Sequence, residues 1–202
     1  MDGIFSIQSC FVWFSTFLSH PPLPAEIATT LNHLWKAKVP SKLHFFGWRV
    51  IHNKMSTKDQ LKKMGILVNS NDFSNVLCLS EEESLPHLMG LCPITSTIWR
   101  KVYEWIGLIE KLSLMEFKSF FAHCDKVKSL SKRSIVAVIW LATAWSIWLK
   151  RNVINFKGES FCFNDCMSEI VVNAWKWLNS KCKIVNSCNF HTWNIPLLGF
   201  RM

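Results

Sequence analysis

The sequence predicts an all-α fold, an irregular multi-helix domain interrupted by one short loop rich in Cys, His and Glu. Three observations support this prediction. Apolar residues recur three and four positions apart along most of the chain, which is the spacing of an amphipathic helix. Prolines, capping residues and glycines stand where such segments begin and end. The alternation typical of strands is weak throughout, and we allow only for a two-stranded ribbon around Asn75 to Cys78.

We expect a series of helices, most of them bounded by a proline, a capping residue or a glycine. In chain order they cover residues 5–18, 25–36, a segment from Pro40 to His52, and residues 57–65, 84–92, 93–107, 135–149 and 164–182. The last of these places Ile170, Ala174, Trp177 and Leu178 on one side. An apolar tail, residues 193–200, is expected to dock irregularly.

The helix from Pro40, which we place in its first turn, has two apolar faces. One face holds Leu43, Phe46, Gly47, Val50 and Ile51, and the other holds Phe45, Trp48 and His52. Such a helix is either buried on both sides or offers one side to a ligand. Burial is the favoured interpretation, because aromatic stripes usually belong to the core.

Capping residues define the next two segments. Thr57 is predicted to cap a helix together with Gln60, and Gly65 to end it. Ser84 is predicted to start a short helix that carries His87 and ends near Cys92. The run Glu81–Glu83 precedes this helix, and we expect its side chains to be solvated.

Charge is concentrated in one part of the chain. The formal net charge is +9, and residues 36–63 hold eight Lys or Arg against one Asp. A basic segment of this kind favours contact with a nucleic-acid backbone. The alternative without a function is a solvated helix face. The basic residues predicted to contact RNA or DNA are Lys42, Arg49, Lys54, Lys58, Lys62 and Lys63, and Phe45 and Trp48 stack on bases if they are exposed.

The sequence favours an intracellular location, in the nucleus or cytoplasm. The eight Cys residues show no disulfide framework, and Asp2 stands where a signal peptide has basic residues. The uncharged segment Ile135–Leu149 has 15 residues. A membrane span needs about 20 residues, so a buried helix is the better interpretation and no membrane partner is expected.

Three residues form a candidate metal site. Cys78, His87 and Cys92 are separated by eight and four residues, and soft thiolates with an imidazole on a short loop and helix turn are typical of a zinc knuckle. Such a knuckle begins with a Cys-x-x-Cys pair, and here Asn75 takes the place of its first Cys. Either zinc binds the three remaining ligands, completed by water or another side chain, or the two Cys are buried thiols without metal.

The ordered motifs around the knuckle resemble the zinc-binding domain downstream of the polymerase in plant LINE-type (non-LTR) retrotransposon reverse transcriptases. The matching residues before the knuckle are Gly3, Phe5, Ser6, Ile7, Ser9, Trp35, Lys36, Pro40, Lys42, Phe46, Trp48, Arg49, Thr57, Leu61 and Gly65. The family's Cys-x-x-Cys, His and Cys fall on Asn75, Cys78, His87 and Cys92, followed by Trp99. The segment Ile139–Asn152 looks like the Trp-rich helix that often follows.

The resemblance implies a division into a zinc-binding-like domain, residues 1–110 with its knuckle at 75–92, and a Trp-rich helical extension, residues 111–202, packed on it. It also implies zinc as a cofactor and a retroelement-derived accessory module as the function. Met1 stands just before the first motif, so we expect a stand-alone fragment without the polymerase. The alternative is a structural remnant with no selected activity.

Catalysis is not expected. The chain has no paired-Asp polymerase motif, no Gly-rich phosphate loop, no G-x-S-x-G and no H-E-x-x-H. The sequence therefore predicts neither an enzyme nor a small-molecule substrate, and it leaves the oligomeric state open.

Overall fold

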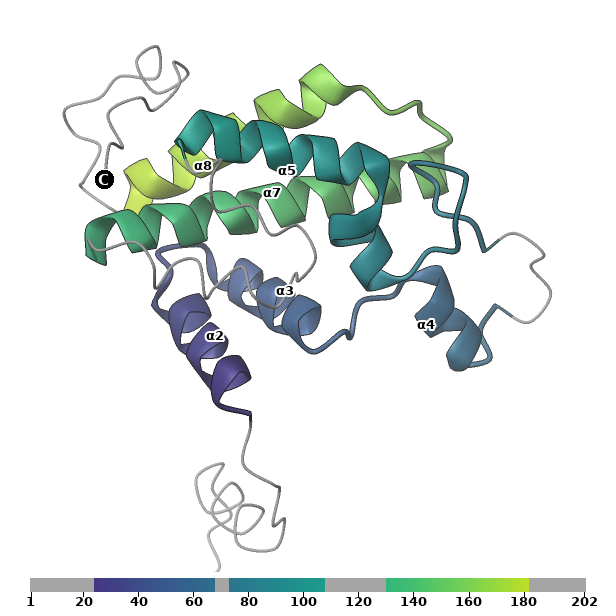
Figure 1. The fold of residues 1–202 in the computed structure, drawn as a ribbon, viewed down its shortest axis with the longest axis horizontal. Helices are drawn as coiled ribbons and strands as arrows, with labels where there is room; N and C mark the ends of the chain where they lie inside the picture. Colours follow the sequence, from purple (N-terminus) through teal and green to yellow (C-terminus); the bar gives the residue numbers. More distant parts are fainter. Residues whose placement is uncertain (1–23, 68–72, 108–129, 182–202) are drawn as a thin grey trace, which may run out of the picture.

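The computed structural model describes residues 24–67, 73–107 and 130–181, and in these ranges the fold is helical with no strand (Figure 1). The predicted helix at residues 5–18 and the tail at 193–200 lie outside the described residues. The elements are α2 (Ala25–Lys36), α3 (Ser41–Ile51), α4 (Lys58–Lys63), the π-helix η1 (His87–Leu91), α5 (Pro93–Ile106), α7 (Leu130–Lys157) and α8 (Phe163–Lys181). The predicted all-α class is confirmed.

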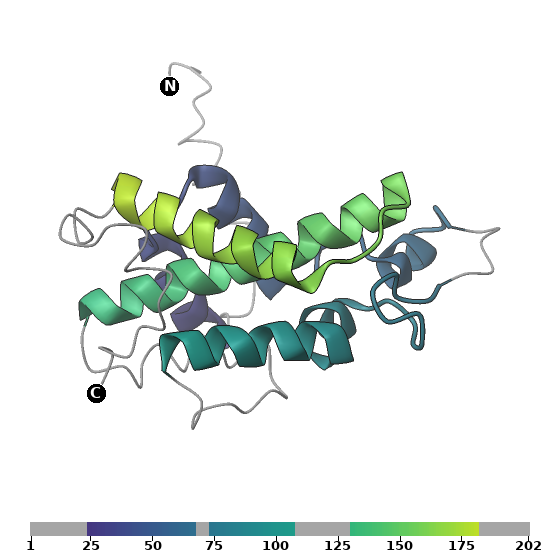
Figure 2. The ribbon, with the colours of Figure 1, turned by 90° about the horizontal axis from the view of Figure 1, so that it is seen from above.

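The long helix α7 is the centre of the fold. It contacts α8, α5, α2 and α3, while η1 packs on α5. Figures 1 and 2 show α5 and α8 running along α7, α2 and α3 on another side, and α4 with the knuckle loop near the C-terminal end of α7. Whether the chain divides into units 1–110 and 111–202 stays a prediction.

The uncharged stretch of α7 is buried almost all round, as predicted. Every residue from Ile135 to Ala144 is buried, and Trp140 is only 1% exposed. The helix continues into the charged residues after Leu149, so it is longer than predicted at both ends. None of the helices in the described ranges is long and apolar enough to cross a membrane.

Helix α3 approaches its neighbours closely at Gly47. A Cβ placed there would lie 2.5 Å from Cδ1 of Leu34 on α2 and 3.0 Å from Cδ2 of Leu141 on α7. The predicted stripe of α3, which includes Gly47, is buried against these helices, whereas Phe45 on the second face is 68% exposed. Burial of both faces, which we favoured, is therefore wrong.

Helix boundaries follow the sequence signals with two corrections. Gly65 and Gly107 take the left-handed conformation, with φ of 70° and 71°, that ends a helix. Pro40 is the N-cap of α3 rather than part of its first turn. Thr57 stands at the N-cap of α4, but its hydroxyl bonds to the Asp59 carboxylate (2.5 Å), and the predicted capping box with Gln60 does not form.

Candidate metal centre

The structure brings the three predicted ligands together. Cys78 lies in the loop before η1, His87 is the first residue of η1, and Cys92 is the N-cap of α5. Their ligand atoms all lie within 4.8 Å of one another, and the Cys78 Sγ is 3.2 Å from the His87 Nε2. His87 and Cys92 are buried, and Cys78 is half-buried. Two thiols and an imidazole therefore face a common point.

A π-turn sets the relation between His87 and Cys92. The Cys92 N–H donates to the carbonyl of His87 at 2.8 Å, which closes a turn over five residues instead of four. Such a turn stacks residues five apart on one side of the helix, whereas an α-turn would rotate them away from each other. The Ser84 hydroxyl accepts from the His87 N–H at 3.3 Å, so the predicted cap of this turn is present. The π-turn itself was not predicted.

The two thiols differ in charge state. Burial raises the pKa of the Cys78 thiol, but hydrogen bonds from the Ser80 side chain and backbone, from His87 and from the Glu81 backbone outweigh burial and lower the pKa to about 6. Burial raises the pKa of Cys92, against hydrogen bonds from the first turn of α5. At neutral pH without metal, Cys78 is therefore a thiolate and Cys92 a thiol.

A carboxylate stands behind the histidine. The Glu81 Oε2 lies 3.0 Å from the His87 Nδ1, although the contact lacks the angle of a hydrogen bond and is electrostatic. The His87 side chain is 5% exposed, while that of Glu81 is 69% exposed. A carboxylate beside Nδ1 favours a proton on that nitrogen, which leaves Nε2 to bind a metal ion, an arrangement common at zinc-bound histidines. Without metal, Nε2 instead carries a proton and donates it to the Cys78 thiolate.

Asn75 does not supply a fourth ligand. Its side chain is fully buried, and its Oδ1 accepts the Leu77 N–H at 2.9 Å, which closes a tight turn. Its own N–H donates to the Glu81 carbonyl at 2.7 Å. The amide Nδ2 is buried with no hydrogen-bond partner. An amide nitrogen is a donor and cannot coordinate a cation, so the oxygen is committed to the backbone and the nitrogen is unsuited to metal.

The donor set nevertheless fits zinc at three positions. In tetrahedral zinc sites the sulfur and nitrogen ligands lie about 2.3 Å and 2.0–2.1 Å from the metal, which places neighbouring ligand atoms about 3.5–3.8 Å apart. The observed separations, from 3.2 Å to at most 4.8 Å, require only small shifts to reach this arrangement. Cys78, His87 and Cys92 would hold the ion, and the fourth position is open to water.

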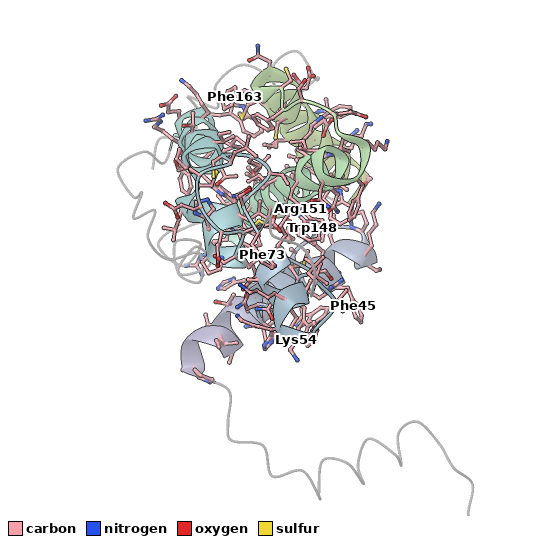
Figure 3. All side chains as sticks on the ribbon, turned by 90° about the vertical axis from the view of Figure 1, so that its right-hand side faces the viewer. Phe45, Lys54, Phe73, Trp148, Arg151 and Phe163 are labelled. Carbon is pink, nitrogen blue, oxygen red and sulfur yellow. The ribbon has the colours of Figure 1, made fainter. Side chains whose placement is uncertain are left out.

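The sequence did not predict the ion pair that joins the knuckle loop, residues 75–92, to α7. Glu83, expected to be solvated, is 0% exposed and pairs with Arg151 of α7, which is 2% exposed. The Arg151 Nε donates to both carboxylate oxygens at 3.1 and 3.0 Å, and its Nη2 donates to Oε1 at 2.5 Å. Figure 3 labels Arg151 and Trp148 next to each other, and the guanidinium lies 5.0 Å from the Trp148 ring centroid.

Glu83 also caps α4. Its Oε1 accepts the Lys58 N–H at 3.0 Å and its carbonyl accepts the Asp59 N–H at 3.1 Å. These bonds replace the predicted capping box, because they satisfy the first free N–H groups of the helix. The predicted ribbon is reduced to a single bridge between Ser74 and Glu82. Along such extended backbone side chains alternate, so Glu83 points inward while Glu82 is exposed.

The predicted nucleic-acid residues lie in different environments. Five are exposed and one, Lys58, is buried with its Nζ donating to the Ser74 carbonyl at 2.9 Å. Arg49 donates to the Lys54 carbonyl at 3.0 Å and so ties down the turn after α3. The exposed five are Lys42, Arg49, Lys54, Lys62 and Lys63.

Aromatic rings gather beside these cations. Trp35, Phe45 and Trp48 line an apolar cavity of about 230 Å³, with Trp35 51% and Phe45 68% exposed. The ring centroids of Phe45 and Trp48 are 6.3 Å apart. Figure 3 places Phe45 and Lys54 at the outer edge of the molecule. The aromatic surface, defined as Trp35, Phe45 and Trp48, is therefore accessible.

Comparison with known proteins identifies the class of this domain. The family model described as zinc-binding in reverse transcriptase matches residues 5–99. This part of the chain is similar to that family, and the matched range includes the whole Cys78–His87–Cys92 cluster. The predicted resemblance is confirmed.

A curated relative comes from a plant. The chain is 29% identical over 103 residues, half of its length, to a putative ribonuclease H protein of Arabidopsis thaliana. The match spans 15% of that relative's length. No solved structure matches the chain.

Proposed function

We propose that this chain is an accessory module that binds single-stranded RNA or DNA, with a zinc-stabilised knuckle that shapes the fold beside the binding surface. The observation that carries the proposal is the exposed aromatic surface flanked by basic residues. The match of residues 5–99 to a family described as zinc-binding in reverse transcriptase supports it, because a reverse transcriptase acts on nucleic acid.

The aromatic surface fits unpaired bases. Large rings on a soluble protein are normally buried, and exposure of Trp35 and Phe45 by half or more calls for a partner. Every base has a flat face, so rings such as these bind single strands with little sequence preference. The half-buried Trp48 ring forms part of the cavity lining beneath them.

The charges around the rings fit the phosphate backbone. Lys42, Phe45 and Arg49 are three and four residues apart on α3, so they share one face of this helix. Between Lys36 and Arg49 the chain has four Lys or Arg and no acidic residue. A strand whose bases stack on the rings would therefore have cations within reach of its phosphates.

The metal would have a structural role. Zinc held by Cys78, His87 and Cys92 would join the knuckle loop, η1 and the start of α5, three segments that otherwise meet through few backbone bonds. Apparent binding energies at four-ligand knuckles are about 10–16 kcal/mol, and a three-ligand site has part of this. We propose binding rather than catalysis as the role of the chain, and an intracellular location.

Fluorescence anisotropy with a labelled single-stranded RNA tests the proposal. Phe45→Ala is expected to weaken binding by about 1–3 kcal/mol, the contribution of one stacked base. Affinity should also fall steeply between 50 and 200 mM salt, roughly by 10² if the five exposed cations each contact a phosphate of a single strand. The matched control is Phe156→Ala, because Phe156 is 75% exposed but lies at the end of α7.

The control decides the interpretation. Equal weakening by Phe45→Ala and Phe156→Ala would show that any exposed ring contributes and would refute a defined surface. Affinity no higher than that of an unrelated protein of the same charge would leave a solvated basic face as the explanation. Loss confined to Phe45→Ala supports the module.

A further inference from the structure

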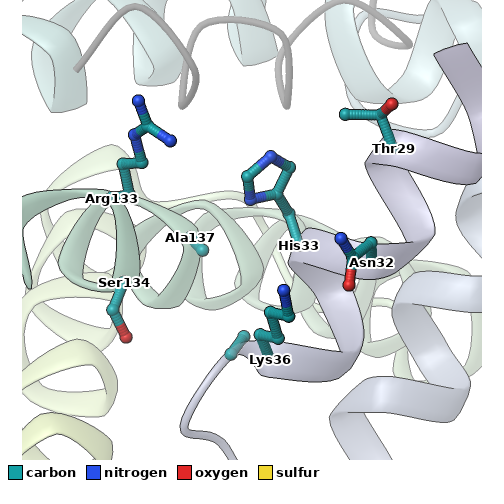
Figure 4. A pocket seen from close by; sticks show the side chains of 8 residues that line it. Thr29, Asn32, His33, Lys36, Arg133, Ser134 and Ala137 are labelled. Carbon is teal, nitrogen blue, oxygen red and sulfur yellow. The ribbon is translucent and has the colours of Figure 1, made fainter. Parts of the chain in front are cut away.

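A second cavity, of about 360 Å³, lies between α2 and the start of α7 (Figure 4). It is separate from the aromatic surface and from the metal centre. Among the described residues, its lining consists of Thr29, Asn32, His33, Lys36, Ala37, Arg133, Ser134 and Ala137.

Helix geometry explains why these residues share one space. Thr29, His33 and Lys36 stand four and three positions apart, so they lie on one face of α2. Arg133 and Ala137 are four apart and lie on one face of α7. Two alanines line the cavity, and their small side chains leave room between helices that contact one another elsewhere. In Figure 4 Arg133, His33 and Thr29 point toward the same side of the cavity.

The lining has the composition of an anion receptor. It contains an arginine, a lysine and a histidine, together with two hydroxyls and one amide, and the eight residues include no carboxylate. Lys36 and Asn32 are exposed, so the donor groups of these two side chains are open to a ligand.

We propose that this pocket binds a phosphate monoester. Such a group carries about −1.5 to −2 charges and three acceptor oxygens. The fork of Arg133 matches two of these oxygens, the Lys36 ammonium supplies a second positive charge, and the Asn32 amide group offers a further donor. A monoester exists both in a mononucleotide and at a phosphorylated end of a nucleic acid. The site does not depend on the proposed binding of single strands by α3.

Isothermal titration calorimetry with inorganic phosphate and adenosine monophosphate tests the pocket. Lys36→Gln and Arg133→Gln should each weaken binding about tenfold, the usual effect of losing a hydrogen bond to a charged group. Lys157→Gln is the matched control, because it removes one exposed charge from the far end of α7. Lys36 is exposed, so its variant is expected to keep the fold even if Arg133→Gln does not.

Two further experiments distinguish a free nucleotide from a nucleic-acid end as the ligand, and this pocket from the proposed single-strand surface on α3. If the protein binds a 5′-phosphorylated oligonucleotide more tightly than its 5′-hydroxyl form, and Lys36→Gln abolishes this difference, the ligand is the end of a nucleic acid. If adenosine monophosphate binds as tightly as the phosphorylated oligonucleotide, the ligand is a free nucleotide. Phe45→Ala should leave phosphate binding unchanged. No measurable binding of either small probe, or equal weakening by Lys157→Gln, would overturn the inference whether or not RNA binds α3.

Discussion

The knuckle loop is held at two points that differ in how completely their polar groups are satisfied. At the metal end, Asn75 keeps the turn but leaves one buried amide nitrogen without a partner. At the other end, Glu83 uses both carboxylate oxygens on Arg151 and the N-terminus of α4. The metal end therefore lacks a fourth ligand, whereas all the polar atoms of the Glu83 carboxylate have partners.

This difference shows how a zinc-binding domain tolerates an incomplete ligand set. The Glu83–Arg151 pair ties the loop to α7, the centre of the core, without metal. The ligands His87 and Cys92 are placed by the π-turn and by α5, which packs on α7. The ligand cluster is thus preformed by contacts outside it, and the proposed zinc would add stability to a loop that is already positioned.

The largest expected loss of stability comes from removing the Glu83–Arg151 ion pair. Arg151→Met leaves Glu83 as an uncompensated buried charge, which typically costs about 3–5 kcal/mol. Urea unfolding followed by circular dichroism measures this loss. The control is Lys150→Met, which removes the neighbouring but partly exposed Lys150–Glu169 pair, whose side chains are 20% and 43% exposed. That pair should contribute about 0–1 kcal/mol, and equal losses in the two variants would refute the role of Arg151.

A smaller effect is expected where α5 meets the π-turn. The indole N–H of Trp99 donates to the Met89 carbonyl of η1, and both groups are buried. Trp99→Phe leaves that carbonyl without its donor, which costs about 1–3 kcal/mol. Because the same turn aligns His87 with Cys92, zinc affinity should fall in parallel. A loss of stability with unchanged zinc affinity would show that the π-turn does not place the ligands.

The thiols provide a test with no expected loss of stability. In zinc-free protein Cys78, with a pKa of about 6, should be alkylated by iodoacetamide at a rate that rises through pH 6 and levels off above it. Burial raises the pKa of Cys166 to about 12, so this thiol should stay unmodified in the folded protein. Mass spectrometry of peptides reads both sites, with the exposed Cys162 as a measure of reagent access. Modification of Cys166 before Cys78 would contradict these environments.

Local signals in the sequence predicted much of the fold. The bounds of α2 coincide with the prediction, and Pro93 and Gly107 mark the ends of α5. Proline fixes the φ angle of a first helical residue, and glycine readily adopts the left-handed conformation that ends a helix. The spacing of Cys78, His87 and Cys92 predicted their approach, since a short loop leaves few other arrangements.

Contacts between distant residues could not be predicted in this way. Glu83 and Arg151 are 68 positions apart, and each stands in a charged stretch that is typical of a solvated surface. Lys58 looked like one more surface cation, yet the fold needs its ammonium for the Ser74 carbonyl. The exposure of Phe45 followed from which face of α3 met α7, a choice that the two apolar faces left open.

The central claim is that Cys78, His87 and Cys92 hold zinc although Asn75 does not contribute. The test is a zinc titration of the zinc-free protein in competition with a chromophoric chelator. The same titration is made with the Asn75→Cys variant. We expect about one zinc per chain in both proteins, bound at least tenfold more tightly by the variant, because a thiolate fills the open position and the orphaned amide is removed. Zinc bound only by the variant, or by neither protein, would contradict it.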